Sequence, residues 1–254
     1  MTCGSSAAAS ERMVPRFDRC ALLLDLDGTL LDIAPTPDSV IIPPDLTDLL
    51  IDLRAALDGA LAIVTGRAID VLDGFLSKTF AAAGEHGGAI RHIPDARIER
   101  TDLPAPPSAW LESAEALIAA HPGALVERKA RGFALHYRLA PDAGPALHAG
   151  LTALLAGVPE FQLLSGLMTW EVRPVGADKG SAVAALMARP PFHGRLPLFI
   201  GDDVTDEDGM RVARTMGGAG LRVDAAFGSP TGVRSWLRQA ARARDWPPLP
   251  GDKR

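Results

Sequence analysis

The sequence predicts an α/β protein in which a parallel-sheet core is interrupted by an α+β insertion. Strand-like and helix-like apolar patterns alternate toward both ends of the chain, as they do around parallel sheets. The middle of the chain instead repeats the order helix, strand, strand twice, which is typical of helices beside an antiparallel sheet. The 254 residues also exceed the roughly 100–150 of a common single domain, so a second domain or a large insertion is expected.

Three buried strands and two helices are expected in the first part of the core. Apolar runs of strand length predict strands at 22–24, 60–64 and 80–83. Apolar residues at helical spacing predict helices over 46–57 and 69–76 between them. This order is that of two successive βαβ units.

A stiff linker, Pro104–Pro107, precedes the first helix of the insertion. Its pattern is helical at 108–120 and 144–155 and strand-like at 124–127, 133–138, 161–164 and 168–173. The pattern favours two helices against one antiparallel sheet.

The alternation of strands and helices resumes after the insertion. Asp178 is expected to cap a helix, and Thr205 with Asp208 resembles a capping box that opens another. Two strands, 196–200 and 220–223, and a last helix, 233–241, complete the expected elements.

These elements set the expected domain boundaries. The core is expected to comprise 18–92 together with 176–244, and the α+β insertion to comprise 93–175. The segments 1–17 and 245–254 are expected to be flexible tails.

Composition excludes several classes of function. A net charge of −5 and an aromatic content of 5% argue against a nucleic-acid partner. No segment approaches the roughly 20 apolar residues of a membrane span, and no signal peptide is recognisable. Cys3 and Cys20 are the only cysteines, and Cys3 falls in an expected tail, which favours a reducing compartment. We therefore expect a cytoplasmic protein, a monomer, that acts on a small molecule.

Two carboxylates directly follow the first expected strand. Asp25 and Asp27 are followed by Gly28 and Thr29, which let the backbone turn away from the sheet. An isolated Asp-x-Asp is usually a plain turn, and a calcium loop is excluded because the further oxygen ligands and closing Glu are absent. Like charges this close resist joint ionisation, so such a pair indicates a bound cation or an acid that works protonated.

Polar residues also follow other expected strands. Thr65 ends the second strand, and Asp202 with Asp203 follows the strand at 196–200. Because ligands bind at the carboxyl ends of parallel strands, these groups are expected at one edge of the sheet. Lys179 near a helix N-terminus is unfavourable with the helix dipole, which favours a functional role and leaves a solvated lysine as the alternative. Thr65 by itself is better explained as an ordinary turn residue. Acids, a fixed cation and hard oxygen ligands together suit phosphoryl transfer with Mg²⁺.

In their order, these motifs resemble those of the haloacid dehalogenase superfamily, which has a Rossmann-like core. The resemblance implies that Asp25 is the nucleophile and that Asp27 is the general acid and base. It implies that Thr65 binds a phosphoryl oxygen and that Lys179 offsets negative charge.

The same resemblance implies a metal site. Mg²⁺ would be held by Asp25, by the backbone carbonyl of Asp27 and by Asp202, with Asp203 in an outer position.

Longer matches resemble the trehalose-6-phosphate phosphatase family and span about 21–238. They are the runs Leu24–Leu30, Val64–Arg67, Gly84–Gly87, Val126–Lys129, His136–Arg138, Trp170–Pro174 and Gly201–Asp208. In that family the insertion is a mobile cap. The resemblance implies that Glu127, Lys129 and Glu171 bind hydroxyl groups of the sugar ring that carries no phosphate.

Further substrate contacts are expected from Gly66, which lies beside Thr65 in the Val64–Arg67 motif, and from three arginines. Arg67, Arg138 and Arg173 are expected to attract a phosphate dianion in an otherwise acidic protein. His86 and His136 are given no chemical role, since the aspartate pair already supplies the acid and base.

The resulting hypothesis is Mg²⁺-dependent hydrolysis of trehalose 6-phosphate through an aspartyl-phosphate. One alternative is a phosphatase for another sugar phosphate, such as sucrose 6-phosphate or a glucosyl- or mannosyl-glycerate phosphate. The other is a sugar-phosphate-binding regulator that has lost catalysis.

Overall fold

The computed structural model describes residues 14–129 and 131–250, which form two compact units. The core unit holds the chain up to Ile33, Val40–Arg100 and the chain from Asp178 onward. The inserted unit holds Ala34–Ser39 and Thr101–Ala177. Each unit has its own sheet and its own apolar core.

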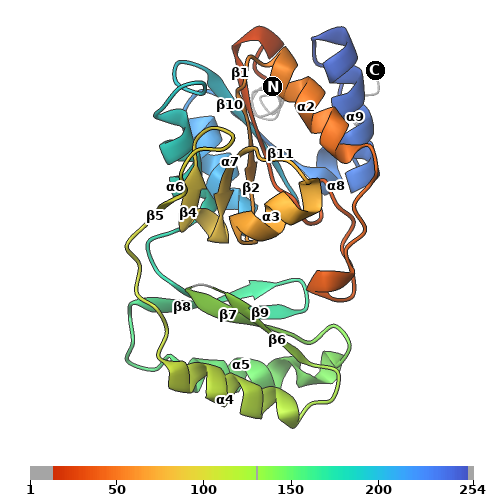
Figure 1. Cartoon of the computed structure of the whole chain (residues 1–254). Coiled ribbons are helices and arrows are strands. Elements are labelled where there is room, and N and C mark those ends of the chain that lie inside the picture. Colours follow the sequence, from red (N-terminus) through yellow and green to blue (C-terminus); the bar gives the residue numbers. More distant parts are fainter. Residues whose placement is uncertain (1–13, 130, 251–254) are drawn as a thin grey trace, which may run out of the picture. The chain divides into compact units, whose positions relative to one another are not determined.

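The core unit is built on a seven-stranded sheet of order β11-β10-β1-β2-β3-β4-β5 (Figure 1). Five of its strands are parallel neighbours: β1 (Cys20–Leu24), β2 (Leu61–Val64), β3 (Ala81–Gly84), β10 (Leu196–Gly201) and β11 (Ala219–Arg222). Two short antiparallel strands, β4 (Ala89–Arg91) and β5 (Glu99–Arg100), extend one edge.

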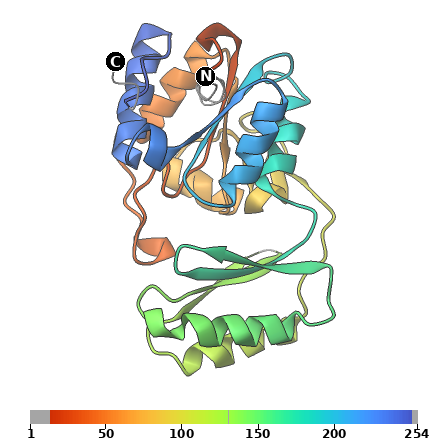
Figure 2. The same ribbon diagram turned by 180° about the vertical axis from the view of Figure 1, so that it is seen from behind.

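Helices cover both faces of this sheet, as the two opposite views show (Figures 1 and 2). On one face lie α2 (Leu46–Ala56), α3 (Ile69–Leu76), α8 (Val223–Ala226) and α9 (Pro230–Ala243), and on the other α6 (Lys179–Met187) and α7 (Asp206–Thr215). Side chains of β1 alternate accordingly, since Leu22 and Leu24 join the first apolar cluster while Ala21 and Leu23 join the second. A strand buried on both faces explains why this run is apolar throughout.

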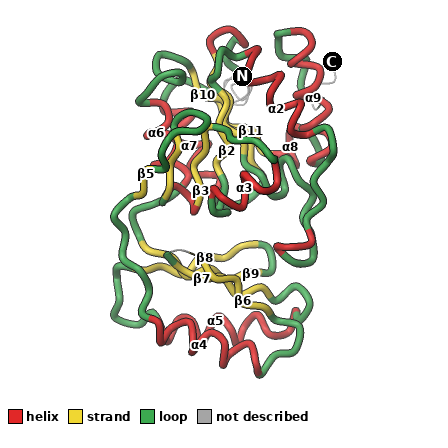
Figure 3. Tube along the Cα trace, in the orientation of Figure 1, coloured by secondary structure: helices red, strands yellow, loops and turns green. Residues whose placement is uncertain are grey.

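The inserted unit is a four-stranded antiparallel sheet of order β6-β7-β9-β8 with two helices packed on one face (Figure 3). The strands are β6 (Leu125–Lys129), β7 (Gly132–His136), β8 (Phe161–Gly166) and β9 (Thr169–Pro174), and the helices are α4 (Ser108–Ala119) and α5 (Gly144–Leu154). Four short 3₁₀ helices complete the described chain: Phe17–Arg19, Pro37–Ser39, Glu85–Gly87 and Pro141–Ala143.

The predicted fold class is confirmed, but the boundaries between the core unit and the inserted unit differ from the predicted ones. The insertion was expected to begin at residue 93, but β5 pairs with β4 in the larger sheet, so the core unit continues to Arg100. Both strands are only two or three residues long and carry no recognisable alternation. The segment Ala34–Ser39, assigned by sequence to the core, groups with the inserted unit.

The described parts of the expected tails are packed rather than free. The buried ring of Phe17 lies edge-on to Trp246 at 4.7 Å, and Trp246 stacks on Trp236 of α9 at 4.8 Å. Indole Nε1 of Trp246 also donates to the carbonyl of Pro15. The proline-rich segment that contains Trp246 forms no helix or strand, yet the indole ring of Trp246 is packed against two other aromatic rings. Residues 1–13, with Cys3, and 251–254 lie outside the described residues.

One of the two expected helix caps is present. The side chain of Asp178 accepts from the backbone N–H of Ser181, and Ser181 reciprocates, which makes a capping box at the start of α6. The prediction of a capping box from Thr205 and Asp208 is wrong, because Thr205 has helical backbone angles and its side chain makes no capping hydrogen bond. None of the described helices is both long and apolar enough to span a membrane.

Candidate active site

Three carboxylates meet where β1 and β10 end. Asp25, Asp202 and Asp206 each place one oxygen within 4.8 Å of the others, and this is the carboxylate cluster. Asp25 and Asp206 are 4% and 0% exposed, while Asp202 is partly exposed. Because β1 and β10 are parallel neighbours in register, with Leu24 opposite Ile200, the residues that follow them meet at one edge of the sheet.

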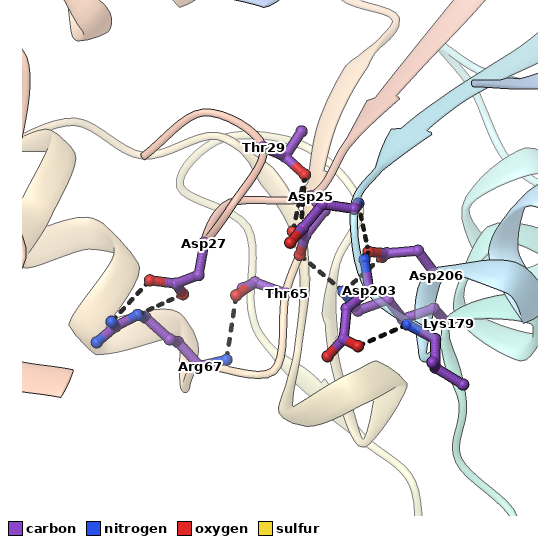
Figure 4. Close-up of polar contacts among 10 residues, drawn as sticks. Asp25, Asp27, Thr29, Thr65, Arg67, Lys179, Asp203 and Asp206 are labelled. Carbon is purple, nitrogen blue, oxygen red and sulfur yellow. Dashed lines mark hydrogen bonds and ion pairs between the residues drawn. The ribbon is translucent and has the colours of Figure 1, made fainter. Parts of the chain in front are cut away.

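Lys179 joins the cluster from the first turn of α6. Its Nζ lies 2.7 Å from Oδ1 of Asp25 and 2.6 Å from Oδ1 of Asp206, and its side chain is 3% exposed (Figure 4). Burial by itself lowers the pKa of Lys179, but the charges of Asp206 and Asp25 outweigh it and raise the pKa. The ammonium therefore stays charged.

Thr29 and Gly28 close the other side of the cluster. The hydroxyl of Thr29 lies 3.1 Å from Oδ2 of Asp25 and 3.2 Å from Oδ1 of Asp202, so its one proton is shared between two carboxylates. Gly28 has a φ of +80°, and a Cβ there would lie 2.1 Å from Oδ2 of Asp202. Only glycine leaves room for that carboxylate.

Asp206, for which the sequence predicted no specific role, holds the backbone and the ammonium of the cluster in place. Its Oδ2 accepts the backbone N–H groups of Asp202 and Asp203, both at 3.0 Å, while its Oδ1 accepts from Lys179. Gly201 makes the space for it, since a Cβ there would lie 2.3 Å from Cγ of Asp206. The signal was present in the sequence, because Asp206 follows Asp202 by four residues in the same motif.

The carboxylate cluster carries more negative than positive charge. When all three carboxylates are ionised, the one ammonium leaves two negative charges uncompensated. Burial and the charge of Asp206 raise the pKa of Asp25 well above its ordinary value, and the same two causes raise that of Asp202 to about 6. Oxygen donors with an uncompensated charge of this size fit a hard divalent cation.

Asp27 points away from this cluster. Both of its oxygens accept from Arg67, with Nε to Oδ2 at 2.7 Å and Nη2 to Oδ1 at 2.8 Å (Figure 4). The guanidinium also lies over the ring of Phe75, 4.8 Å from its centroid. Buried Thr65, at the end of β2, accepts the backbone N–H of Arg67 with its hydroxyl at 3.1 Å. Asp27, Thr65 and Arg67 therefore form one connected group.

Two further residues expected at this edge of the sheet lie apart from the carboxylate cluster. The side chain of Asp203 accepts the N–H of Val204 at 2.6 Å and contributes no oxygen to the cluster. Gly66 packs against the ring of His86, because a Cβ at Gly66 would lie 2.6 Å from Nε2. The structure thus brings Asp25, Lys179 and Asp202 together with Asp206, while the side chain of Asp203 lies outside the carboxylate cluster.

A second polar group lies on the inserted sheet, on the face opposite its helices. Strand alternation turns Val126 and Val172 toward the helices, and so places their neighbours Glu127, Glu171 and Arg173 on the other face. Lys129 lies on this face as well, with Nζ 2.9 Å from Oε2 of Glu171. We call this set, together with His136 and Thr169 on the same face, the polar face.

The polar face balances its charges internally. Burial by itself lowers the pKa of Lys129, but the charges of Glu171 and Glu127 raise it overall. Burial raises the pKa of Glu127, but a hydrogen bond from His136 and the charge of Lys129 bring it below its ordinary value. Both groups therefore stay ionised. Arg138 follows β7 and donates to the carbonyl of Leu167 at 3.1 Å.

Comparison with known proteins identifies the family. The Trehalose-phosphatase family model matches residues 23–234. The chain belongs to this family. It is 44% identical to a probable trehalose-phosphate phosphatase of Sinorhizobium fredii over 82% of this chain and 78% of that protein. It is 38% identical to trehalose-6-phosphate phosphatase of Escherichia coli over 80% of this chain and 77% of that protein.

Solved structures show the same fold. The C-terminal domain of Candida albicans trehalose-6-phosphate phosphatase superposes with a TM-score of 0.73 at 23% identity, over 89% of this chain and 93% of that one. The sucrose-phosphatase of Synechocystis superposes with a TM-score of 0.51 at 17% identity, over 89% and 90%. The chain therefore shares its fold with these phosphatases.

Proposed function

We propose that this chain hydrolyses trehalose 6-phosphate to trehalose and phosphate, with an aspartyl-phosphate on Asp25 as intermediate. Family membership supports the substrate. The observation that carries the chemistry is the buried contact of 2.7 Å between Lys179 and Asp25, beside two more carboxylates. A nucleophilic carboxylate needs such a cation, because an anion approaching a phosphate ester is repelled.

In the first step an oxygen of Asp25 attacks phosphorus and the bond between phosphorus and the sugar oxygen breaks. Asp27, released from Arg67 and protonated from solvent, supplies this proton to the leaving sugar oxygen. Lys179 reduces the repulsion between Asp25 and the phosphoryl oxygens, and Thr65 and Gly66 contact the phosphoryl group at the end of β2.

In the second step water attacks the phosphorus of the aspartyl-phosphate, and the bond from phosphorus to Asp25 breaks. Asp27 takes the proton of that water, which returns both carboxylates to their starting states. Because both oxygens of Asp27 are held by Arg67 in the structure, the acid and base role requires this ion pair to open. In this proposal Arg67 then contacts the phosphate.

The carboxylate cluster is proposed to hold Mg²⁺ through Asp25, Asp202 and the backbone carbonyl of Asp27. Asp206 is not needed as a ligand, because its oxygens already accept from Lys179 and from two backbone N–H groups. Mg²⁺ bound there would neutralise the surplus charge of the cluster and polarise the phosphoryl group.

The polar face is proposed to recognise the sugar ring that carries no phosphate. Glu127 and Glu171 accept from hydroxyl groups and Lys129 donates to them. Arg138 and Arg173 add positive charge for the phosphorylated ligand. A site of paired polar groups disfavours ligands that leave those groups unpaired, so this face is the proposed source of specificity.

Phosphate release from a panel of esters tests the proposal. The panel contains trehalose 6-phosphate, sucrose 6-phosphate, glucosylglycerate phosphate and mannosylglycerate phosphate, each with and without Mg²⁺. We expect the highest kcat/KM with trehalose 6-phosphate and no turnover by Asp25→Asn. Equal or faster turnover of another ester would replace the substrate, and tight binding without turnover by the unaltered protein would indicate a regulator.

The proposed active form is a monomer, since one copy carries both the carboxylate cluster and the polar face. Light scattering after size exclusion, with activity measured in the same fractions, tests this. Activity confined to a dimer would contradict it.

A further inference from the structure

A chain of three side chains crosses three strands on the polar face. His136 of β7 lies 2.8 Å through Nε2 from Oε2 of Glu127 on β6, and 3.0 Å through Nδ1 from Oγ1 of Thr169 on β9. The register explains the arrangement, because His136 is directly opposite both Leu125 and Thr169, and Glu127 is two residues further along β6 on the same face. His136 is thus fixed from both sides.

The hydrogen-bond network determines where the proton of His136 lies. The hydroxyl of Thr169 has a second acceptor, the carbonyl of Leu167, at 3.5 Å, which is much weaker than the contact at 3.0 Å to the ring. The hydroxyl therefore donates to Nδ1, and this leaves the ring proton on Nε2. In this assignment Nε2 donates to Glu127.

This donation occupies one oxygen of Glu127 and leaves the other available. Oε2 accepts from His136, while Oε1 accepts no hydrogen bond from any residue in the described ranges 14–129 and 131–250. The same contact helps to keep Glu127 ionised despite burial. A carboxylate held in this way presents an acceptor in a fixed direction.

We propose that His136 is a positioning residue that orients Glu127 toward a sugar hydroxyl, with Thr169 fixing the imidazole. This rests on the proposed function, in which Glu127 binds the sugar. The role is not one of supporting the sheet, since both ring contacts are to side chains and the strands pair through their backbones. Glu171 needs no such residue, because Lys129 already holds it.

The test compares trehalose 6-phosphate with p-nitrophenyl phosphate, which has no sugar. We expect His136→Ala to lower kcat/KM for trehalose 6-phosphate about 10- to 100-fold, mainly through KM, as for loss of a ground-state contact. Turnover of p-nitrophenyl phosphate is expected to stay within about twofold. His136→Gln keeps a donor near the position of Nε2, so its kcat/KM for trehalose 6-phosphate should be close to that of the unaltered protein. Thr169→Val should lower this kcat/KM, whereas Thr169→Ser, which keeps the hydroxyl, should not.

A double-mutant cycle decides between positioning and an independent effect. In a Glu127→Gln background, His136→Ala should cause little further loss, because the group on which it acts has changed. Additive losses, or equal losses on both substrates, would overturn the role of His136 and leave the proposed function standing. If the unaltered protein cleaves p-nitrophenyl phosphate but not trehalose 6-phosphate, the proposed function fails and this role fails with it. Thermal melting of each variant identifies any that do not fold.

Discussion

The carboxylate cluster and the polar face both gather charged groups, but they balance charge differently. In the cluster, three carboxylates share one ammonium and the pKa values of Asp25 and Asp202 rise. On the polar face, Lys129 pairs with Glu171 and His136 bonds to Glu127, and the pKa of Glu127 falls. The surplus in the first region demands an added cation, whereas the second is already satisfied and suits neutral hydroxyl ligands.

The difference follows from how each region is built. The cluster uses residues just beyond the ends of parallel strands, where side chains from distant parts of the sequence converge. The polar face uses residues within antiparallel strands, where cross-strand neighbours pair one to one. The following predictions test this contrast, beginning with the largest expected effect.

Removing the nucleophile should abolish turnover. Asp25→Asn replaces a carboxylate with an amide that cannot attack phosphorus, so we expect kcat to fall by about three orders of magnitude or more. The measurement is continuous phosphate release, with circular dichroism as the check on folding. Multiple turnovers at a rate near that of the unaltered enzyme would remove Asp25 from the proposed mechanism.

Removing the buried cation should cost stability as well as activity. Lys179→Met leaves the cluster without its ammonium, and loss of one partner from a buried ion pair typically costs about 3–5 kcal/mol. Denaturant unfolding measures this. Adding Asp206→Asn, which removes one negative charge and keeps an acceptor for the backbone, should restore part of the stability and none of the activity. Unchanged stability in Lys179→Met would contradict the charge argument.

Ionisation of the carboxylate cluster at higher pH should lower the stability of the metal-free protein, whereas Mg²⁺ binding should raise it. Asp202 has a pKa raised from 3.8 to about 6, so the folded state holds this proton more tightly than the unfolded state. Its stabilising contribution is present below about pH 4 and is lost as pH rises to about 6. Asp202→Asn should therefore stabilise the metal-free protein at pH 8 by roughly 1 kcal/mol, allowing for solvent screening.

Mg²⁺ provides the complementary measurement. It should raise the Tm of the unaltered protein, since saturation at about 100 times Kd contributes about 2.7 kcal/mol, and chelation should abolish turnover. Asp202→Asn should lose most of the Tm increase. An equal increase in both proteins would show that Mg²⁺ binds elsewhere.

Changes on the polar face should affect one substrate class only. Glu171→Gln is expected to lower kcat/KM for trehalose 6-phosphate about 10- to 100-fold and to leave p-nitrophenyl phosphate nearly unchanged. Arg128→Gln is the matched control, because Arg128 lies on the opposite face of the same sheet and pairs with Glu115 of α4. It should change stability by at most about 1 kcal/mol and specificity not at all. A specificity change in the control would contradict the assignment of faces.

The sequence pattern predicted the central strands and the long helices, but not the short strands at one edge of the larger sheet. Apolar periodicity located β1, β2, β10 and the helices α2, α3, α4, α5 and α9, because burial on a sheet or helix face repeats at a regular interval. The helices α6 and α7 were expected from capping residues at their starts. It missed β4 and β5, whose few residues bury too little to leave a pattern. The packing of Trp246 on Trp236 was also missed, because it joins residues through a contact that periodicity does not encode.

The sequence by itself determined the fold class and several residues of the carboxylate cluster, because strand ends and helix caps are local features of the chain. It identified Asp25, Lys179 and Asp202 in this way. Only the tertiary structure decided which partner each group has. Asp206 holds Lys179 and Arg67 holds Asp27, while His136 holds Glu127. Such pairings depend on strand register and on side-chain directions across elements distant in sequence, and pKa values follow from those distances.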